Sequence, residues 1–342
     1  MKRLFFCGLL VLLCTAQADA QQRREWPQTP FTTDTLMVHD PVMAFEDGTY
    51  YLYSTGMGIG MASSKDRKTW TVYPKGVLKD SIPAWTHDSV PGFRRHIWAP
   101  DIIRWNGRWW MMYSCSTFGK NGSAIGLLTN KTLNPESPDY HWKDCGAVIV
   151  SKESRDNWNA IDPNIVIDDD DRPWVVWGSF WDGIQLARLD TTIHLCSSPS
   201  TIARRHAPDC KDAEPNPTSD HAGTNAIEAP FIMKHGEWYY LFVSWDYCCR
   251  GEKSNYRVAV GRSRRVDGPY IDRKGQDMRN GGGTLIAEGD HQKFEAMGHC
   301  AAYSFDGKDL FICHGYSIEL KGTSVLVQKN ILWTDDGWPV LE

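Results

Sequence analysis

The chain has 342 residues, a formal net charge of −5 and 12% aromatic residues, including 16 tryptophans. This length suits one large domain or two ordinary ones, and such an aromatic content argues against a disordered chain. No block of basic residues occurs, which argues against nucleic acid as a partner. The tryptophan surplus is typical of a well-filled core and equally of clefts that bind the flat apolar faces of sugars.

The first twenty residues have the pattern of a signal peptide. A positive MKR start, the apolar run LFFCGLLVLL and a small-residue cleavage site at Ala18–Ala20 follow in order. The apolar run is too short for a permanent membrane span. Leu13 precedes Cys14, where a lipoprotein signal needs a small residue. We therefore predict a periplasmic or secreted protein without a lipid anchor, whose mature chain is residues 21–342.

The cysteines suit an oxidising compartment. Cleavage of the signal peptide removes two of the ten cysteines, and the even number that is left permits disulfides. Cys196 and Cys210 bracket a polar insert and are predicted to pair. Cys248 and Cys249 are adjacent and form either a strained bridge or two separate thiols. Since the sequence contains no Cys-x-x-Cys motif, we do not expect a zinc site.

A strand pattern recurs along the chain, in which turn residues precede aromatic and β-branched residues. The five copies are GTYYLYST from Gly48, GRWWMMYS from Gly107, RPWVVWGS from Arg172, GEWYYLFVS from Gly236 and GKDLFICHGY from Gly307. A second apolar strand follows each copy: IGMASS, AIGLLT, IQLARL, RVAVGR and VLVQKN. Short strands that repeat every 60 to 70 residues or so predict an all-β fold, a single five-bladed β-propeller over residues 21–342.

Two polar stretches are assigned to loops. Residues 197–224 are rich in proline, aspartate and histidine, lie between the third and fourth repeats, and are predicted to form one long loop. The four aspartates at 168–171 are compatible with calcium binding. They precede a strand where a hairpin turn is expected, so a solvated turn is the preferred interpretation.

A polar residue stands near the start of the strand before each aromatic strand. NAIDPNIV from Asn159 and NAIEAPFI from Asn225 both place a carboxylate and a proline before apolar residues, as does VHDPVM from Val38. Proline is tolerated at the first residue of a strand, so each proline marks the start of an inner strand. The polar residues at the five starts are Asp40, Asp101, Asp162, Glu228 and His299. Because a propeller gathers its inner strands around one axis, we predict that they converge on one acidic pocket.

Such a pocket has the ingredients for cleaving a glycosidic bond. This reaction needs one carboxyl group to protonate the leaving oxygen and a second to activate water or to attack carbon. The acid needs a raised pKa, which burial and neighbouring negative charge supply. The alternative interpretation is that each of these residues is an ordinary turn residue before a proline.

Six motifs together resemble glycoside hydrolase family 43 over nearly the whole mature chain. They are HDP, WAPD, NAIDP, GSFWDGI, EAPFI and DYCCRG. Among them, GSFWDGI and the CCRG part of the last motif are similar to the endo-1,5-α-L-arabinanases in particular. The resemblance implies a five-bladed propeller that hydrolyses α-1,5-linked arabinofuranosyl bonds with inversion, endo-acting and monomeric. The implied substrate is plant cell-wall arabinan or arabino-oligosaccharides.

The resemblance also implies a role for each residue that matches a family motif. Asp40 matches the general base, Glu228 the general acid, and Asp162 the third carboxylate, which raises the pKa of the acid. His299 matches the histidine beside an axial calcium ion that is ligated mostly by water. The family often has Gly-Pro-Gly-His there, whereas this chain has Glu-Ala-Met-Gly-His. Apart from the resemblance, a lone histidine on an inner strand is also a common hydrogen-bonding core residue.

Further residues are candidates for contact with the sugar. They are His39, Trp98, Phe118, Asn159 and Ser179. The aromatic residues among them are equally suited to packing within a blade, and the asparagine is equally suited to capping a turn.

The rival functions are an exo-arabinanase, an arabinofuranosidase or a xylosidase of the same family, and a sugar-binding propeller without catalysis. The sequence leaves open endo or exo action, tolerance of arabinan side chains, the disulfide pairing, the metal and the oligomeric state.

Overall fold

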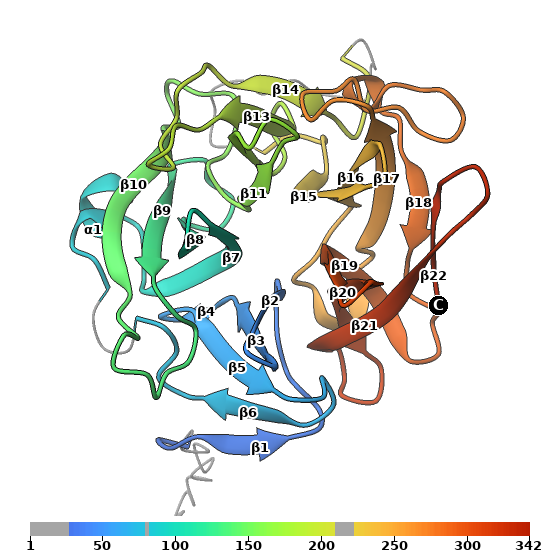
Figure 1. Cartoon of the computed structure of the whole chain (residues 1–342). Helices are drawn as coiled ribbons and strands as arrows, with labels where there is room; N and C mark the ends of the chain where they lie inside the picture. Colours follow the sequence, from blue (N-terminus) through green and yellow to red (C-terminus); the bar gives the residue numbers. More distant parts are fainter. Residues whose placement is uncertain (1–26, 79–81, 209–221) are drawn as a thin grey trace, which may run out of the picture.

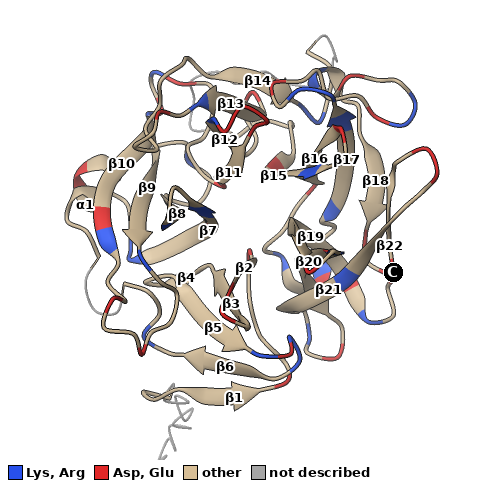
Figure 2. Cartoon of the chain, viewed as in Figure 1, with Lys and Arg blue, Asp and Glu red and all other residues tan. Residues whose placement is uncertain are grey.

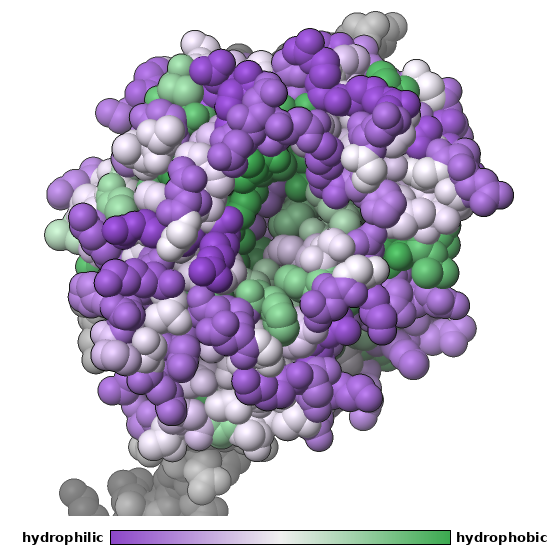
Figure 3. All heavy atoms as spheres, in the orientation of Figure 1, coloured by the Kyte–Doolittle hydropathy of each residue, from purple (hydrophilic) through white to green (hydrophobic). Residues whose placement is uncertain are grey.

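The computed structural model describes residues 27–78, 82–208 and 222–342, so the predicted signal peptide and Cys210 lie outside the described residues. The described chain forms five antiparallel sheets arranged as blades around a common axis, which confirms the predicted five-bladed β-propeller (Figure 1). The space-filling view shows a hollow on this axis, called the central channel below (Figure 3). None of the helices in the described residues has the length and apolar character that a membrane span requires.

Blades I and II contain the first ten strands. From the axis outward, blade I consists of β2 (Val42–Glu46), β3 (Thr49–Ser54), β5 (Gly60–Ser64), β6 (Trp70–Tyr73) and β1 (Phe31–Thr33). Blade II consists of β7 (His96–Trp105), β8 (Arg108–Cys115), β9 (Ser123–Asn130) and β10 (Lys143–Ser151), and β4 (Gly56–Met57) pairs with β7. The short helix α1 (Trp85–Ser89) precedes β7.

Blades III, IV and V have four strands each. Blade III consists of β11 (Asn164–Ile167), β12 (Pro173–Trp177), β13 (Ile184–Arg188) and β14 (Ser200–Ala203). Blade IV consists of β15 (Ile227–His235), β16 (Trp238–Trp245), β17 (Arg257–Ser263) and β18 (Thr284–Ala287). Blade V consists of β19 (Phe294–Phe305), β20 (Lys308–Ser317), β21 (Thr323–Trp333) and β22 (Pro339–Leu341). Two 3-10 turns, η1 (Gly251–Lys253) and η2 (Met278–Asn280), complete the elements.

The five aromatic segments form the second strand of each blade, and the apolar segments after them form the third, as predicted. Tight turns fix the register of the first hairpin. Asp47-Gly48 and Asn106-Gly107 both have positive φ, as a two-residue type I′ turn requires. One prediction is wrong: residues 197–224 are not all loop, because Ser200–Ala203 pair with β13 as the outer strand of blade III. The last two residues of this strand, Ile202 and Ala203, are buried.

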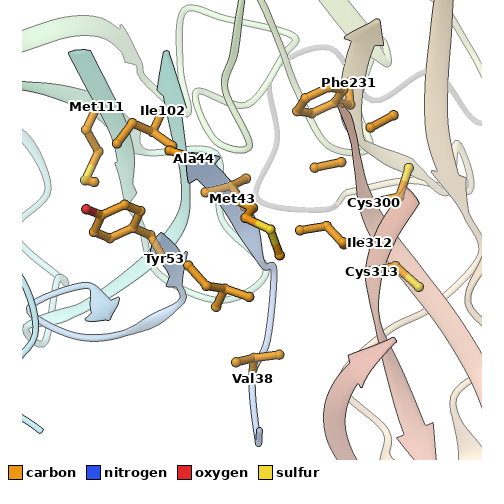
Figure 4. Packing of buried hydrophobic residues seen from close by; sticks show 14 of the residues in the cluster. Val38, Met43, Ala44, Tyr53, Ile102, Met111, Phe231, Cys300, Ile312 and Cys313 are labelled. Carbon is orange, nitrogen blue, oxygen red and sulfur yellow. The ribbon is translucent and has the colours of Figure 1, made fainter. Parts of the chain in front are cut away.

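Apolar packing holds the blades together and the N-terminal segment closes the ring. One buried cluster includes Met43, Ile102, Phe231 and Ile312 from blades I, II, IV and V (Figure 4). Residues 36–38 run antiparallel to β21 and join the first blade to the last, with Val38 N–H 3.2 Å from the Ser324 carbonyl oxygen. Charged residues of both signs are spread around the ring, and neither sign gathers in one sector (Figure 2).

A left-handed residue marks the inner strand of every blade. The five residues are Asp40, Ala99, Asp162, Ala229 and His299, with φ of 54°, 35°, 57°, 52° and 51°. Three of them lie at β-bulges of β7, β15 and β19, and two lie just before β2 and β11. A residue with a side chain is strained in this conformation, so it persists only where neighbouring structure holds it.

Hydrogen bonds between neighbouring blades hold these five residues. Each backbone N–H donates to a side chain of the preceding blade: Asp40 to His314 Nδ1 (3.0 Å), Ala99 to Thr55 Oγ1 (2.8 Å), Asp162 to Ser114 Oγ (3.0 Å), Ala229 to Asp162 Oδ2 (3.2 Å) and His299 to Ser244 Oγ (2.8 Å). We call this set the inter-blade ring. Four acceptors stand at the end of the second strand. In blade III this position is Gly178, which has no side chain to accept a hydrogen bond. A Cβ there would lie only 2.6 Å from the Gly183 carbonyl oxygen, so a larger residue does not fit. The Asp162 carboxylate accepts the N–H of Ala229 instead.

The ring predicts the effect of removing one acceptor. Ser114→Ala leaves the buried N–H of Asp162 without its partner, and we expect the free energy of unfolding to fall by about 1–3 kcal/mol. Chemical denaturation measures this change. Ser198→Ala, at an exposed position, is the matched control and should change stability little. A Ser114→Ala protein as stable as the control would contradict the role of the ring.

Candidate active site

The inter-blade ring brings four predicted site residues to the central channel. Asp40 comes from blade I, Asp162 from blade III, Glu228 from β15 of blade IV and His299 from β19 of blade V. Asp40 is 3.0 Å from His299, between the carboxylate Oδ1 and the imidazole Nδ1. The carboxylate of Asp162 accepts the N–H of the residue that follows Glu228. Residues that are far apart in the sequence therefore share one buried site.

Asp40 is surrounded by groups that stabilise its ionised form. Its carboxylate contacts His39 Nδ1 at 2.8 Å and His299 Nδ1 at 3.0 Å, and it accepts a hydrogen bond of 2.5 Å from the Thr55 hydroxyl. Burial alone would raise the pKa of Asp40, but the positive charges of His299 and His39 and their hydrogen bonds hold it well below its usual value. Asp40 is thus an ionised carboxylate at neutral pH, ready to accept a proton.

Glu228 lies in the opposite environment. Its two carboxyl oxygens accept hydrogen bonds from the Ser179 hydroxyl (2.8 Å) and the Tyr256 hydroxyl (2.7 Å). Burial raises the pKa of Glu228 by more than these two hydrogen bonds lower it. A carboxyl group with a raised pKa keeps its proton at higher pH and is suited to act as a general acid.

Asp162 adds a second buried carboxyl group near the acid. Burial raises its pKa well above the usual value, and the negative charges of Glu228 and Asp40 raise it further, against the lowering effect of His299. Two buried carboxyl groups that repel each other do not both ionise readily. The pair therefore retains a proton that it can give to a leaving group.

His314 lies next to Asp40 and His39. It is fully buried, its ring stacks on His39 with centroids 3.9 Å apart, and its Nδ1 accepts the N–H of Asp40. Burial and the positive charges of His39 and His299 hold the pKa of His314 well below its usual value. A neutral imidazole is required for this role, because Nδ1 must be unprotonated to accept.

The other sequence candidates occupy different environments. Ser179 hydrogen-bonds to Glu228, and Trp98 is half-buried one residue before the left-handed Ala99. Phe118 is 78% exposed. Asn159 is buried, with its Oδ1 bound by the Ser123 hydroxyl and its Nδ2 bound to a carbonyl oxygen. Contact of these residues and of His39 with sugar stays a prediction.

One expectation from the sequence is wrong. Asp101 does not join the pocket, because the left-handed residue of its blade is Ala99 and the bulge there changes which residue faces the axis. The Asp101 carboxylate is 2% exposed and accepts from the Ile165 N–H (2.7 Å) and the Asn164 amide (3.2 Å), which ties blade II to blade III. Burial raises its pKa to about 6.

Sequence reasoning missed the residues that hold the predicted catalytic groups. Thr55 and His314 orient Asp40, and Tyr256 binds Glu228. A signal for two of them was present, since the aromatic segment of blade I ends in Thr55 and that of blade V has His314 two residues before its end. Tyr256 lies in a segment that repeats nowhere else in the chain, and nothing in the sequence marked it.

The predicted cation at His299 has few protein ligands. Nδ1 of His299 faces Asp40, which leaves Nε2 for an ion. Within the described residues, two groups of three ligand-type side chains lie close together, and His299 belongs to neither. Calcium takes six to eight oxygen ligands, so the residues present fit an ion bound mostly through water and do not form a cage of their own.

Known proteins of one family match this chain. Glycosyl hydrolases family 43 matches residues 33–339. The extracellular exo-alpha-(1->5)-L-arabinofuranosidase ArbA of Cellvibrio japonicus is 44% identical over 308 residues, which cover 89% of this chain and 86% of the relative. The extracellular endo-alpha-(1->5)-L-arabinanase 1 of Bacillus subtilis is 36% identical over 308 residues, 89% of this chain and 87% of the relative.

A solved structure supports the same assignment. The crystal structure of an exo-1,5-alpha-L-arabinanase from a bovine ruminal metagenomic library has 54% sequence identity and a TM-score of 0.84. The match covers 90% of this chain and 98% of that chain.

The hydrogen bonds of Glu228 predict a shift in pH dependence. Tyr256→Phe removes a bond that lowers the pKa of Glu228, so this pKa rises. Because a general acid is active when protonated and activity is lost as pH rises through its pKa, the alkaline limb of kcat/KM should move to higher pH. Tyr270→Phe, which removes a buried hydroxyl bonded to Val266, is the control and should leave the limb in place. An unchanged limb in Tyr256→Phe, or one at lower pH, would contradict Glu228 as the acid.

Proposed function

The chain belongs to glycosyl hydrolases family 43, and we propose that it hydrolyses α-1,5-linked L-arabinofuranosyl bonds in arabinan with inversion of configuration. The names of the two relatives support the substrate. The observation that carries the mechanism is the opposite shift of two carboxyl groups: the pKa of Asp40 is held well below its usual value, and the pKa of Glu228 is raised. We propose the same extracellular location that the names of the relatives give.

In the proposed reaction Asp40 takes a proton from a water molecule. The oxygen of that water attacks the anomeric carbon while Glu228 gives its proton to the leaving glycosidic oxygen. In inverting enzymes the two carboxyl groups stand roughly 6.5 to 9.5 Å apart, which leaves room for water. Asp40 and Glu228 belong to blades I and IV, with blade V between them, and this arrangement supports a base and an acid on different sides of the substrate.

The neighbouring groups prepare both steps. His39, His299 and Thr55 aim the Asp40 carboxylate and keep it ionised until the water arrives. The negative charge of Glu228 raises the pKa of Asp162, because two negative charges side by side are costly, and we propose that the proton the pair retains is available to Glu228. A propeller that only binds sugar does not need two carboxyl groups whose pKa values are shifted in opposite directions. Hydrolysis is therefore better supported than sugar binding without catalysis.

Exo action is the mode that we favour. The relatives at 54% and 44% identity have exo names, whereas the relative at 36% identity is an endo-arabinanase. Arg205, which follows β14, contacts blade IV: its N–H donates to Asn225 Oδ1 at 2.7 Å, and its guanidinium pairs with Asp246 at 3.3 Å. Endo action, which the sequence motifs imply, is the second candidate.

We further propose a divalent cation, most suitably calcium, near His299. His299 would hold it through Nε2, and water would supply the remaining ligands. When bound, the ion would supply positive charge that offsets the repulsion among the three carboxylates. His299 itself also offsets the repulsion among the carboxylates. Burial lowers its pKa, but Asp40, Asp162 and Glu228 raise it by more, which favours the positively charged imidazole.

The products of linear arabino-oligosaccharides decide between the two modes. At low conversion we expect one short product to accumulate from the start, because an exo enzyme cuts at a fixed distance from a chain end. Chromatography of early time points measures this pattern. A range of product sizes at the earliest times, with a rapid fall in arabinan viscosity, would establish endo action instead.

Replacing either carboxyl group should abolish most of the activity. We expect Glu228→Gln and Asp40→Asn each to lower turnover on debranched arabinan by about a hundredfold or more, the usual scale for loss of acid or base. The assay is reducing-sugar release, with melting temperature as a check on folding. Glu237→Gln, at an exposed residue that pairs with Arg264, is the control and should keep its activity. Near-normal turnover in either site variant would overturn the assignment of roles.

Removal of the cation should have two effects. After prolonged chelation we expect lower activity and a lower melting temperature, both restored by calcium, since the repulsion among the carboxylates is then less well balanced. Elemental analysis shows whether the metal is gone. Metal-free protein with full activity and an unchanged melting temperature would rule out a role for the ion.

A further inference from the structure

Two adjacent cysteines stand beside the proposed site without a role in it. Cys248 and Cys249 follow β16, and their sulfur atoms are 2.6 Å apart. Cys249 is exposed, and Cys248 packs against the buried cluster of Tyr256, Ala296 and Tyr316. The seven cysteines in the described parts of the chain are all free thiols. This pair is therefore both reachable from solvent and in contact with residues around the acid and the base.

Cys249 is connected to the base by two routes. Its sulfur lies 3.7 Å from His39 Nε2, and its backbone N–H donates to the Tyr316 hydroxyl at 2.6 Å. The same hydroxyl is 3.1 Å from His39 Nε2, and His39 Nδ1 contacts Asp40 at 2.8 Å. A change at Cys249 therefore reaches Asp40 through one residue, His39.

The geometry favours a bond between the two sulfurs over a shared metal ion. A zinc ion with Zn–S bonds of about 2.3 Å in tetrahedral geometry would keep its sulfur ligands roughly 3.8 Å apart. The observed 2.6 Å places the two sulfur atoms in direct contact, too close for that arrangement. Cys249 also has a φ of 63°, a strained backbone conformation that persists only where neighbouring structure holds it.

We propose that Cys248 and Cys249 are a redox-modifiable dithiol that closes to a vicinal disulfide by exchange with an oxidised small-molecule thiol, and that the closed pair is the working form of the enzyme. The Cys249 thiolate attacks one sulfur of the oxidant disulfide and releases one thiolate, which leaves a mixed disulfide. The Cys248 sulfur then loses its proton and attacks the Cys249 sulfur, which releases the second thiolate. Two protein thiols are oxidised, one disulfide is reduced to two thiols, and the two protons pass to these thiols.

The surroundings of the pair suit this chemistry. The hydrogen bond from Cys248 lowers the pKa of Cys249 to about 5 against the effect of burial, with a further contribution from His39. A thiolate is the attacking form in disulfide exchange. In the oxidising compartment that we propose for this protein, the closed form persists.

The closed pair acts locally and not through overall stability. A disulfide between neighbours closes the shortest possible loop, so it constrains the unfolded chain little. Closure does fix the backbone of Cys249, whose N–H donates to the Tyr316 hydroxyl. Because this hydroxyl contacts His39 Nε2, closure also fixes the ring of His39. Reduction frees this contact, and we expect kcat to fall roughly two- to tenfold, the effect of losing one hydrogen bond, while KM and the melting temperature change little.

The experiment uses the whole mature protein in two states. One sample is incubated with oxidised glutathione and the other with dithiothreitol, and both are desalted before measurement. Mass spectrometry of the peptide with Cys248 and Cys249 should show the loss of two hydrogens and resistance to alkylation in the oxidised sample. Kinetics on a linear arabino-oligosaccharide should show the lower kcat only in the reduced sample, with recovery on reoxidation.

Variants separate this pair from the other thiols. Cys196→Ser, at an exposed cysteine outside the site, should respond to reduction as the unchanged protein does. Cys248→Ser with Cys249→Ser should lose the response. A peptide that stays a dithiol in oxidised glutathione, a reduced enzyme whose kcat is equal or higher, or a response that persists in the double variant would overturn the proposal. The activity measurement depends on the proposed function, whereas the mass measurement does not. Failure of the cysteine proposal is therefore distinguishable from failure of the proposed function.

Discussion

The site depends on one constraint, the left-handed conformation of a single residue in the inner strand of each blade. Asp40, Ala99, Asp162, Ala229 and His299 all adopt it, at a cost that only surrounding structure can offset. The backbone N–H of each donates to a side chain of the preceding blade, so the five hydrogen bonds form a closed ring around the axis. The ring stabilises the contact between blades and also fixes the direction of the side chains at the channel. Three of its five members carry groups of the proposed reaction.

The electrostatics of the site follow from this arrangement. Asp40 lies on the side of blade V, which contributes His299 and His314, and a second imidazole comes from its neighbour His39. Glu228 lies among the hydroxyl groups of Ser179 and Tyr256 with no cation in contact in the described structure. Burial affects both carboxyl groups, yet only Asp40 has positive charges close enough to outweigh it. One fold thus produces a base and an acid from the same chemical group.

Much of the architecture was predictable from the sequence, because it follows from repetition. The aromatic segments, with their Asp-Gly and Asn-Gly turns, gave the number of blades and the order of strands. The prolines located the inner strands, and the carboxylates next to them located Asp40, Asp162 and Glu228. The assignment of Asp101 failed, since Ala99 holds the ring position at the bulge and the Asp101 carboxylate accepts hydrogen bonds from Asn164 and Ile165 of the next blade. Tyr256 was not predictable, because its contact with Glu228 arises only when the loop after β16 folds back over the site.

The central claim is that an ionised Asp40 and a protonated Glu228 act on opposite sides of one glycosidic bond. The most direct test is the configuration of the first product. Proton NMR of a fresh reaction on an α-linked arabino-oligosaccharide should show the β-anomer first, with the α-anomer appearing later by mutarotation. If the α-anomer is the initial product, the substrate is cleaved with retention, and the proposed roles of the two carboxyl groups are wrong.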